Sequence, residues 1–490
     1  MNILFDTNII IAINDPTRPL DPRLAKIEQL IDHLSFHVFV HPVQKDDFER
    51  DENAERKALN LSRLVRYNSL QSPPIPSTED IKQLEWSQNN DHDRIDNILL
   101  YALYSHAIHI FVTEDRALLN KARRVGLQDQ VFRIDQFLFF LECQCAPDFS
   151  VPVGIQEKPV YALHPQSEFW DSLRESYRES FDQWFEKISR EHRSAWCICD
   201  KNGDPLAVCI YKEENSPPVT NEQYRLPGRV LKLCTFKVSK ELQGRKLGER
   251  LLFTAFKFAQ KNNINYVYLH TRSQDKLIEL CLDFGFSHLG KYNADEVYYK
   301  QMFSPVSGGD YALPPIDYLL KYYPYFVDDE RVNKFIVPID KAYHNELFPD
   351  VSDDAQGLFA EEFSCEKPQS NTIKKAYLSH SNTNQVSPGD IILFYRTGDR
   401  QSIEVLGVVE KAIRTQDLSV LTALVAKRTV YSTDELRWWI QKPTLIILFR
   451  YVKTIPPISR TAFSAAGIKG NIQTIRKMNH KSYAKLMEMQ

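Results

Sequence analysis

The stretch 231–252 constrains this chain most, because it predicts a strand, a basic turn and a helix in direct succession. It reads LKLCTFKVSKELQGRKLGERLL, with alternating apolar residues first and apolar residues at helical spacing after Gly248. The first N–H groups of a helix have no partner within the helix, and the helix dipole places positive charge at that end. Arg245 and Lys246 add full charges there. We expect the turn to bind an anion, with pyrophosphate as the ligand, although an ordinary solvated turn is the simpler alternative.

The sequence around this turn also alternates between strands and helices. Strands are expected over 265–270 and 296–300, and a second amphipathic helix over 275–283. Upstream, one long helix is expected over 168–187, followed by two apolar runs that Asn202-Gly203 separates. An Asn-Gly pair between such runs predicts a tight hairpin.

Residues 230–302 resemble the GNAT family of acyl-CoA-dependent N-acetyltransferases. The pyrophosphate loop of that family reads Q/R-x-x-G-x-G/A, which Gln243 and Gly248 fit, whereas Lys246 replaces the first glycine. The resemblance implies an α+β domain over 153–303 that uses acetyl-CoA, with a strand amide stabilising the oxyanion. The residues implied to bind the cofactor are Phe236, Lys237, Val238, Gln243, Gly244, Arg245, Lys246, Leu247 and Gly248.

The proton donor of this transferase stays open in the sequence. The family often carries a tyrosine that protonates the leaving thiolate where this chain has Cys281. Tyr292 is the candidate for that role, with Tyr298 and Cys281 as alternatives, and packing explains each of the three equally simply. No residue is assigned as the general base that the attacking amine requires.

Residues 1–148 alternate short strands and helices, which predicts a parallel α/β sheet. One strand ends at Asp6, another leads to Asp115, and a helix begins near Asp93 and Asp96. Ligands of such sheets lie at the carboxyl ends of strands, so we expect these acids to converge. Carboxylates held together require a cation, and Mg²⁺ or Mn²⁺ takes oxygen ligands and activates water. Helix capping explains any one of these acids alone.

The motifs FDTN at Asp6, DNILLYA at Asp96 and TED at Asp115 resemble the PIN-domain ribonuclease family. The resemblance implies that these acids hold a catalytic metal ion and cleave RNA with metal-activated water. The metal-binding set that it implies is Asp6, Asp47, Asp93, Asp96 and Asp115.

Two positions around this acidic set keep alternatives. Asp47 before Phe48 matches the fourth acid of the family, and Asp46 and Glu49 are its rivals. Asn8 or Thr113 is expected to hold a carboxylate or water in place.

The last third of the chain, 334–490, contains short apolar runs that predict a mainly β barrel. Strands are expected at 335–338, 391–396, 405–409, 420–426 and 444–452. The turn at 388–390 before IILFY resembles the PUA-like superfamily with its ASCH and EVE branches, which implies binding of RNA or modified bases. Residues 441–490 hold nine Lys or Arg and one acid, which suits phosphates, although a solvated basic tail is the simpler alternative.

Length and composition bound the remaining choices. A chain of 490 residues is too long for one core, and a net charge of −3 gives no general affinity for nucleic acid. Eight cysteines without a C-x-x-C pair predict reduced thiols rather than a zinc site. The chain shows no signal peptide and no run of about 18 apolar residues, so we expect a cytoplasmic protein with no membrane partner.

The sequence therefore predicts a multidomain protein: a PIN-like parallel sheet, a GNAT fold, a linker at 304–333 and a PUA-like barrel. The joint hypothesis is a toxin-like effector, both ribonuclease and N-acetyltransferase, acting on RNA such as tRNA or on the translation apparatus. In one alternative only the GNAT domain is catalytic and the other two bind RNA; in another, acetyl-CoA gates the nuclease. The acceptor stays open among aminoacyl-tRNA, a protein lysine or N-terminus, and a polyamine, as does the oligomeric state.

Overall fold

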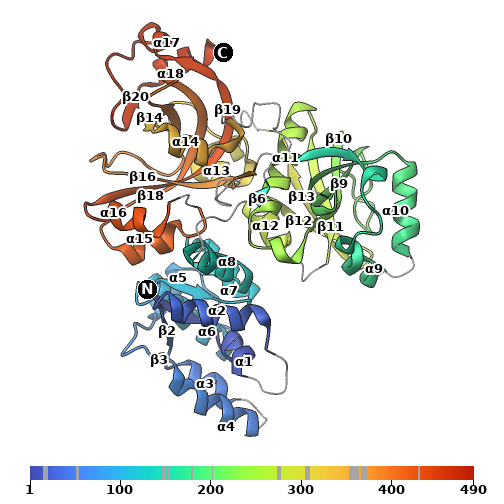
Figure 1. The fold of residues 1–490 in the computed structure, drawn as a ribbon, viewed down its shortest axis with the longest axis vertical. Coiled ribbons are helices and arrows are strands. Elements are labelled where there is room, and N and C mark those ends of the chain that lie inside the picture. The colour runs from blue at the N-terminus through green and yellow to red at the C-terminus, as the bar shows by residue number, and fades with distance from the viewer. Residues whose placement is uncertain are drawn as a thin grey trace. The chain divides into compact units, whose positions relative to one another are not determined.

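Two compact units make up the described chain (Figure 1). One consists of Met1–Phe149 and Thr415–Thr444, and the other of Ser150–Arg414 and Leu445–Gln490. None of the described helices has the length and apolar character needed to cross a membrane. The computed structural model describes residues 1–14, 20–50, 54–145, 151–152, 154–177, 180–200, 202–272, 277–303, 309–351, 364–365, 372–428 and 431–489.

The first unit contains the expected parallel sheet, with strand order β3-β2-β1-β4-β5. Its strands are β1 (Asn2–Phe5), β2 (His37–Val40), β3 (Asn68–Ser69), β4 (Ile110–Val112) and β5 (Val131–Phe132). Its helices are α1 (Thr7–Asn14), α2 (Pro22–His33), α3 (Gln44–Glu49), α4 (Ala54–Arg63), α5 (Thr78–Gln83), α6 (Asp91–Tyr104), α7 (Arg116–Arg124) and α8 (Ile134–Cys145). Side chains alternate along a strand, so Ile3 and Phe5 join the core on one face of the sheet and Leu4 joins the core on the other.

Two helices from late in the chain complete this unit: α15 (Leu418–Val425) and α16 (Thr433–Trp439). The prediction of a strand over 420–426 was wrong, because a buried apolar run of this length fits a strand or a helix equally well. The carboxylate of Asp417 decides for the helix by accepting the N–H groups of Ser419 and Val420 at 2.7 and 3.1 Å. The buried side chains of Ala423 and Ala426 then join the core of the first unit.

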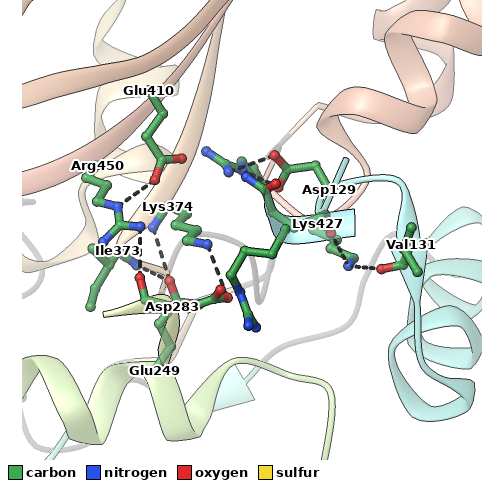
Figure 2. Close-up of polar contacts among 12 residues, drawn as sticks. Asp129, Val131, Glu249, Asp283, Ile373, Lys374, Glu410, Lys427 and Arg450 are labelled. Atoms are coloured by element: carbon green, nitrogen blue, oxygen red, sulfur yellow. Dashed lines mark hydrogen bonds and ion pairs between the residues drawn. The ribbon is translucent and has the colours of Figure 1, made fainter. Parts of the chain in front are cut away.

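A buried ion pair fastens the end of α15. The Arg428 guanidinium donates from Nε and Nη2 to the two carboxylate oxygens of Asp129, both at 2.8 Å, and both side chains are buried. The neighbouring Lys427 donates from Nζ to the carbonyl of Val131 at 2.5 Å (Figure 2). It also lies 4.3 Å above the ring of Phe132. Residues near β5 are thus tied to a segment about 300 positions later in the sequence.

Replacing Arg428 with Met should destabilise the first unit by about 3–5 kcal/mol, because Asp129 would stay buried without its partner. Removing both charges with Arg428→Met and Asp129→Leu should recover most of this loss. Urea denaturation would measure the change. Arg437→Met is the matched control: its ion pair with Asp434 is exposed and should contribute under about 1 kcal/mol. An equal effect at both arginines would contradict the buried clamp.

The second unit begins with a seven-stranded sheet of order β12-β13-β11-β10-β9-β8-β7. The strands are β7 (Gln156–Pro159), β8 (Ser194–Cys199), β9 (Pro205–Asn215), β10 (Arg229–Val238), β11 (Tyr266–Thr271), β12 (Ser287–Tyr292) and β13 (Asp295–Gln301). The pair β10–β11 is parallel and the other pairs are antiparallel. The Asn-Gly hairpin between β8 and β9 is confirmed.

The helices of this sheet partly match the expectation. The predicted helices after the basic turn are α11 (Leu247–Lys261) and α12 (Leu277–Asp283). The single helix expected over 168–187 is instead a 3-10 turn η3 (Glu168–Trp170), α9 (Asp171–Tyr177) and α10 (Ser180–Arg190), with 178–179 outside the described residues.

The predicted linker is partly helical. Its residues 304–308 lie outside the description, as does the predicted boundary at Val153. The rest contains α13 (Pro315–Tyr322), where Tyr318 is fully buried. Tyr323, the residue directly after this helix, is also buried and donates its hydroxyl to the carbonyl of Tyr451 at 2.6 Å. Tyr323 therefore ties this segment to the C-terminal sheet.

The C-terminal sheet has six strands in the order β16-β19-β18-β17-β14-β20. They are β14 (Lys334–Ile339), β16 (Lys374–Ser379), β17 (Ile391–Arg396), β18 (Ser402–Thr415), β19 (Thr444–Ser459) and β20 (Arg476–Met478). Its helices are α14 (Lys341–Leu347), α17 (Arg460–Ala465) and α18 (His480–Glu488). The barrel expected from the sequence is not closed in the described residues, where β16 and β20 remain the two edges. Among the described strands, β20 pairs with β14 and β16 pairs with β19, so no pairing joins the two edges.

Candidate functional site

Strands β10 and β11 of the second unit are paired over only part of their length and then separate. Their parallel pairing runs from Val230 opposite Tyr266 to Leu233 opposite Leu269 and ends there. Beyond this point β10 continues to Val238 paired with β9, and a β-bulge interrupts that pairing after Leu233. Among the described residues, no strand pairs with the β11 side of this part of β10, which makes its N–H groups available to a ligand.

A cavity of about 590 Å³ lies at this separation. Its walls come from β9, β10 and β11 and from the helical segments α9, α10 and α12. Phe181 and Trp184 form an aromatic wall, and the charged or ionisable groups that line the cavity are Arg193, Lys212, Glu214, Lys232, His270, Arg272 and Asp295.

The turn before α11 has the backbone geometry of an anion site. Gly244 and Lys246 both have positive φ, at +83° and +66°. Lys246 is the N-cap of α11 and makes no side-chain cap bond, so the first N–H groups of the helix stay open to a ligand. A Cβ on Gly248 would lie 3.3 Å from the side chain of Leu280 and 3.5 Å from that of Phe236. The turn therefore fits a pyrophosphate, with Lys246 bearing a left-handed conformation that costs about 1–2 kcal/mol.

The structure separates the predicted cofactor residues into two groups. Gln243 to Gly248 form the turn itself, and Phe236 to Val238 lie on β10 beyond the bulge. The ammonium of Lys237 donates to the carbonyl of Phe169 and to Ser172 Oγ. Lys237 is therefore placed to offer its backbone rather than its side chain.

The three candidate proton donors differ in position. Cys281 is fully buried in the core. Tyr292 is 38% exposed and its ring stacks on His270 with 4.8 Å between centroids. Tyr298 makes an edge contact with His288 instead. Tyr298 is the cross-strand partner of Leu269, so Tyr292 and Tyr298 both neighbour residues that line the cavity.

Glu214 and His270, two residues of the cavity, were not identified from the sequence as candidates for the site. Glu214 accepts the hydroxyl of Tyr268 at 2.6 Å and lies 3.0 Å from the ammonium of Lys212. Burial raises the pKa of Glu214, but these bonds outweigh it, so the pKa lies below its usual value. His270 lies at the carboxyl end of an expected strand beside the basic turn, and this position could have identified it as a site residue from the sequence.

His270 presents a neutral imidazole at the separation of the strands. Burial, with the nearby charge of Lys232, lowers the pKa of His270 to about 4. In the described structure its Nε2 is buried without a hydrogen-bond partner. A buried nitrogen of this kind is costly unless a ligand or water satisfies it.

In the first unit, four of the predicted acids lie close enough to repel one another. Asp6 is buried and accepts the hydroxyl of Thr113 at 2.6 Å, as expected for that threonine. Burial raises the pKa of Asp6 to about 6, with contributions from Asp115 and Asp47. Burial and the charge of Asp6 raise the pKa of Asp96 to about 7.

The remaining acids have other partners. Asp93 lies 3.5 Å from the ammonium of Lys121, and the bond from the Asn89 backbone lowers its pKa. The rivals of Asp47 for the fourth place are more exposed: Asp46 pairs with Arg94 at 3.5 Å, and Glu49 pairs with Lys45 at 3.8 Å.

Three further observations bear on a metal ion. Asp115 also caps α7 by accepting the N–H groups of Ala117 and Leu118 at 2.7 and 3.0 Å. Asn8, the alternative to Thr113, is exposed. Among the residues that the structure describes, no three acidic, histidine or cysteine side chains are close enough together to hold a metal ion. The acids thus show mutual repulsion, which a divalent cation would relieve, without forming a closed metal cage.

The raised pKa of Asp96 makes the stability of the metal-free protein depend on pH. Between about pH 4 and pH 7 the folded protein holds a proton that the unfolded chain has released, so stability falls as the pH rises through this window. Asp96→Asn should flatten this slope and add roughly 1–3 kcal/mol at pH 8, since one pKa unit corresponds to about 1.4 kcal/mol. Thermal unfolding in EDTA from pH 5 to 8 would measure it. Asp46→Asn, at an exposed acid, is the control, and an unchanged slope in Asp96→Asn would refute the coupling.

Comparison with known proteins agrees with the geometry of the second unit. Residues 158–286 match the acetyltransferase (GNAT) family. The chain contains a GNAT acetyltransferase domain. A search of curated proteins finds no match.

Solved structures resemble parts of the chain. An ASCH protein from Zymomonas mobilis shares 12% identity over 32% of this chain and 94% of its own, with a TM-score of 0.25. A GNAT-family acetyltransferase from Staphylococcus aureus Mu50 shares 16% over 30% and 98%, with a TM-score of 0.23. The PaiA N-acetyltransferase of Thermoplasma acidophilum, in complex with coenzyme A, shares 15% over 30% and 98%, with a TM-score of 0.22.

Proposed function

We propose that the protein transfers an acetyl group from acetyl-CoA to an amine bound in the cavity between β10 and β11. The observation that carries this proposal is the separation of these strands directly before the basic turn of α11. The turn offers unpaired amides to a pyrophosphate, and the cavity offers room for the thioester and the amine. Both features lie within the segment that matches the GNAT family.

When bound, acetyl-CoA would supply the activated acyl group. The amides of the α11 turn hold the pyrophosphate, and an amide of β10 past Leu233 stabilises the developing oxyanion. Glu214 is ionised and attracts the incoming ammonium group. The free Nε2 of His270 accepts the proton that the amine must lose, directly or through water. Tyr292, stacked on His270, stays the candidate for protonating the leaving thiolate.

His270→Gln should lower kcat by roughly 10²–10⁴-fold, because the variant loses the proton acceptor but keeps a similar shape. The Kd for acetyl-CoA, from calorimetry, should stay unchanged. Thiol release would be measured with a lysine peptide, spermidine and an aminoacyl-tRNA as acceptors. His288→Gln is the control, since His288 is paired with Glu296 on the sheet edge. If the variant keeps wild-type kcat, His270 is not the base; if the wild type fails to bind acetyl-CoA, the transferase assignment is wrong.

We also propose that the first unit is a PIN-type ribonuclease that requires Mg²⁺ or Mn²⁺. The observation in favour is that burial raises the pKa of Asp6 and of Asp96, with further contributions from the charges of Asp47 and Asp115 at both and of Asp6 at Asp96. Oxygen ligands of this kind suit hard divalent ions, which would supply Lewis-acid activation of water. Asp93 remains a further candidate ligand, with Lys121 as its partner in the metal-free state. In the alternative, this unit binds RNA and only the transferase is catalytic.

Asp6→Asn should abolish Mn²⁺ binding and RNA cleavage, because it removes the most buried of the four acids. Binding to the wild type at pH 6 should release protons, since the metal must displace them from Asp6 and Asp96. Calorimetry in two buffers of different ionisation enthalpy would count these protons. Asp46→Asn should behave as wild type. Equal cleavage by wild type and Asp6→Asn would remove the nuclease from this unit.

The C-terminal domain is proposed to bind the RNA. It contains a polar cavity of about 600 Å³ between β14, β16 and β17, lined by Tyr377, His380, Tyr395 and Arg460. Aromatic rings stack on bases and a guanidinium binds phosphate, so the lining suits a nucleotide. Together with the two activities, this supports a cytoplasmic, toxin-like effector that acts on RNA such as tRNA or on the translation apparatus.

A further inference from the structure

A buried carboxylate connects the basic turn to the C-terminal sheet. Glu249 lies in the first turn of α11, is 3% exposed, and belongs to the same compact unit as β16. Its Oε1 accepts the backbone N–H groups of Ile373 and Lys374 at 3.0 and 3.1 Å (Figure 2). The ammonium of Lys246 lies 3.7 Å from its other oxygen.

The same sheet also grips the end of α12, the helix that packs against the turn. The Asp283 carboxylate pairs with the ammonium of Lys374 at 3.2 Å, and its carbonyl accepts Nη2 of Arg450 at 2.9 Å (Figure 2). Arg450 is 1% exposed and donates from Nε to Glu410 at 2.5 Å. Both helices that border the turn are therefore fastened to β16 and to its neighbour β19, which Glu410 of β18 supports in turn.

These contacts solve two problems at the turn. Lys246 holds a left-handed conformation that glycine adopts without cost, so the turn needs support from outside itself. A carboxylate in the first helical turn would also repel a pyrophosphate if its charge were free. The two N–H groups and Lys246 engage that charge and direct it away from the open amides.

We propose that Glu249 is a positioning residue, through which strand β16 holds the acetyl-CoA turn in its binding shape. The C-terminal domain is then a structural part of the transferase as well as an RNA-binding module. This inference rests on the proposed acetyl-CoA site. In this inference, the contacts of Glu249 and Lys374 couple the C-terminal sheet to the acetyl-CoA turn. The residues that contact the acceptor take no part in this coupling.

The experiment compares Glu249→Gln, Glu249→Ala and Lys374→Met in the full chain. Each should raise the Kd and KM for acetyl-CoA together, by roughly 10- to 100-fold for Glu249→Ala, because hydrogen bonds to charged groups are lost. Glu249→Gln keeps one acceptor oxygen and should fall between Ala and wild type. The kcat at saturating acetyl-CoA should stay unchanged, which distinguishes positioning from catalysis.

Calorimetry with acetyl-CoA alone gives Kd, thiol release gives KM and kcat, and circular dichroism reports folding. Glu186→Gln is the matched control, since that glutamate is exposed and pairs only with Arg190 on the same helix. A folded Glu249→Ala with wild-type Kd would overturn the inference while leaving the transferase intact. If Glu249→Ala does not fold, a wild-type Kd in a folded Glu249→Gln would overturn it equally. A wild type that does not bind acetyl-CoA would remove both this inference and the proposed function.

Discussion

The parting of β10 from β11 is the constraint on which the candidate transferase site depends. Two parallel strands that stay paired satisfy each other's amides and leave no room for a ligand. Here the pairing ends at Leu233 and Leu269, and the bulge on β10 re-aims the residues that follow. The cavity, the free amides and the end of β11 at His270, which β10 no longer pairs with, are all consequences of that one interruption.

The part of the site formed by residues close together in the sequence could be predicted. The part formed by residues far apart in the sequence could not be predicted. The free amides of the α11 turn follow from the succession of strand, turn and helix, which the sequence displays directly. Glu214 and His270 belong to strands on either side of β10, and only strand order brings them to one cavity. A lone glutamate in a polar strand end and a lone histidine carry no spacing pattern of their own.

The acids of the first unit show the same limit at shorter range. Asp93 and Asp96 are neighbours on one helix, and their spacing alone makes both equally good candidates for a metal ligand. Their surroundings differ: Asp93 has the ammonium of Lys121, whereas Asp96 faces the buried charge of Asp6. The prediction of a strand over 420–426 is wrong for a related reason. An apolar run indicates that the segment is buried, but it does not indicate whether the segment is a strand or a helix.

The segment 415–444 belongs to the first unit although it is inserted in the sequence of the C-terminal domain. It lies between two strands of the C-terminal sheet, and composition gives no sign that it leaves that domain. Yet it contributes Ala423 and Ala426 to the core of the first unit and buries Arg428 against Asp129. The acidic unit therefore cannot be complete in a protein that ends near residue 149. Because the strands that flank the insertion, β18 and β19, also carry Glu410 and Arg450, the same pair of strands holds the end of α12 and supplies the last helices of the acidic unit.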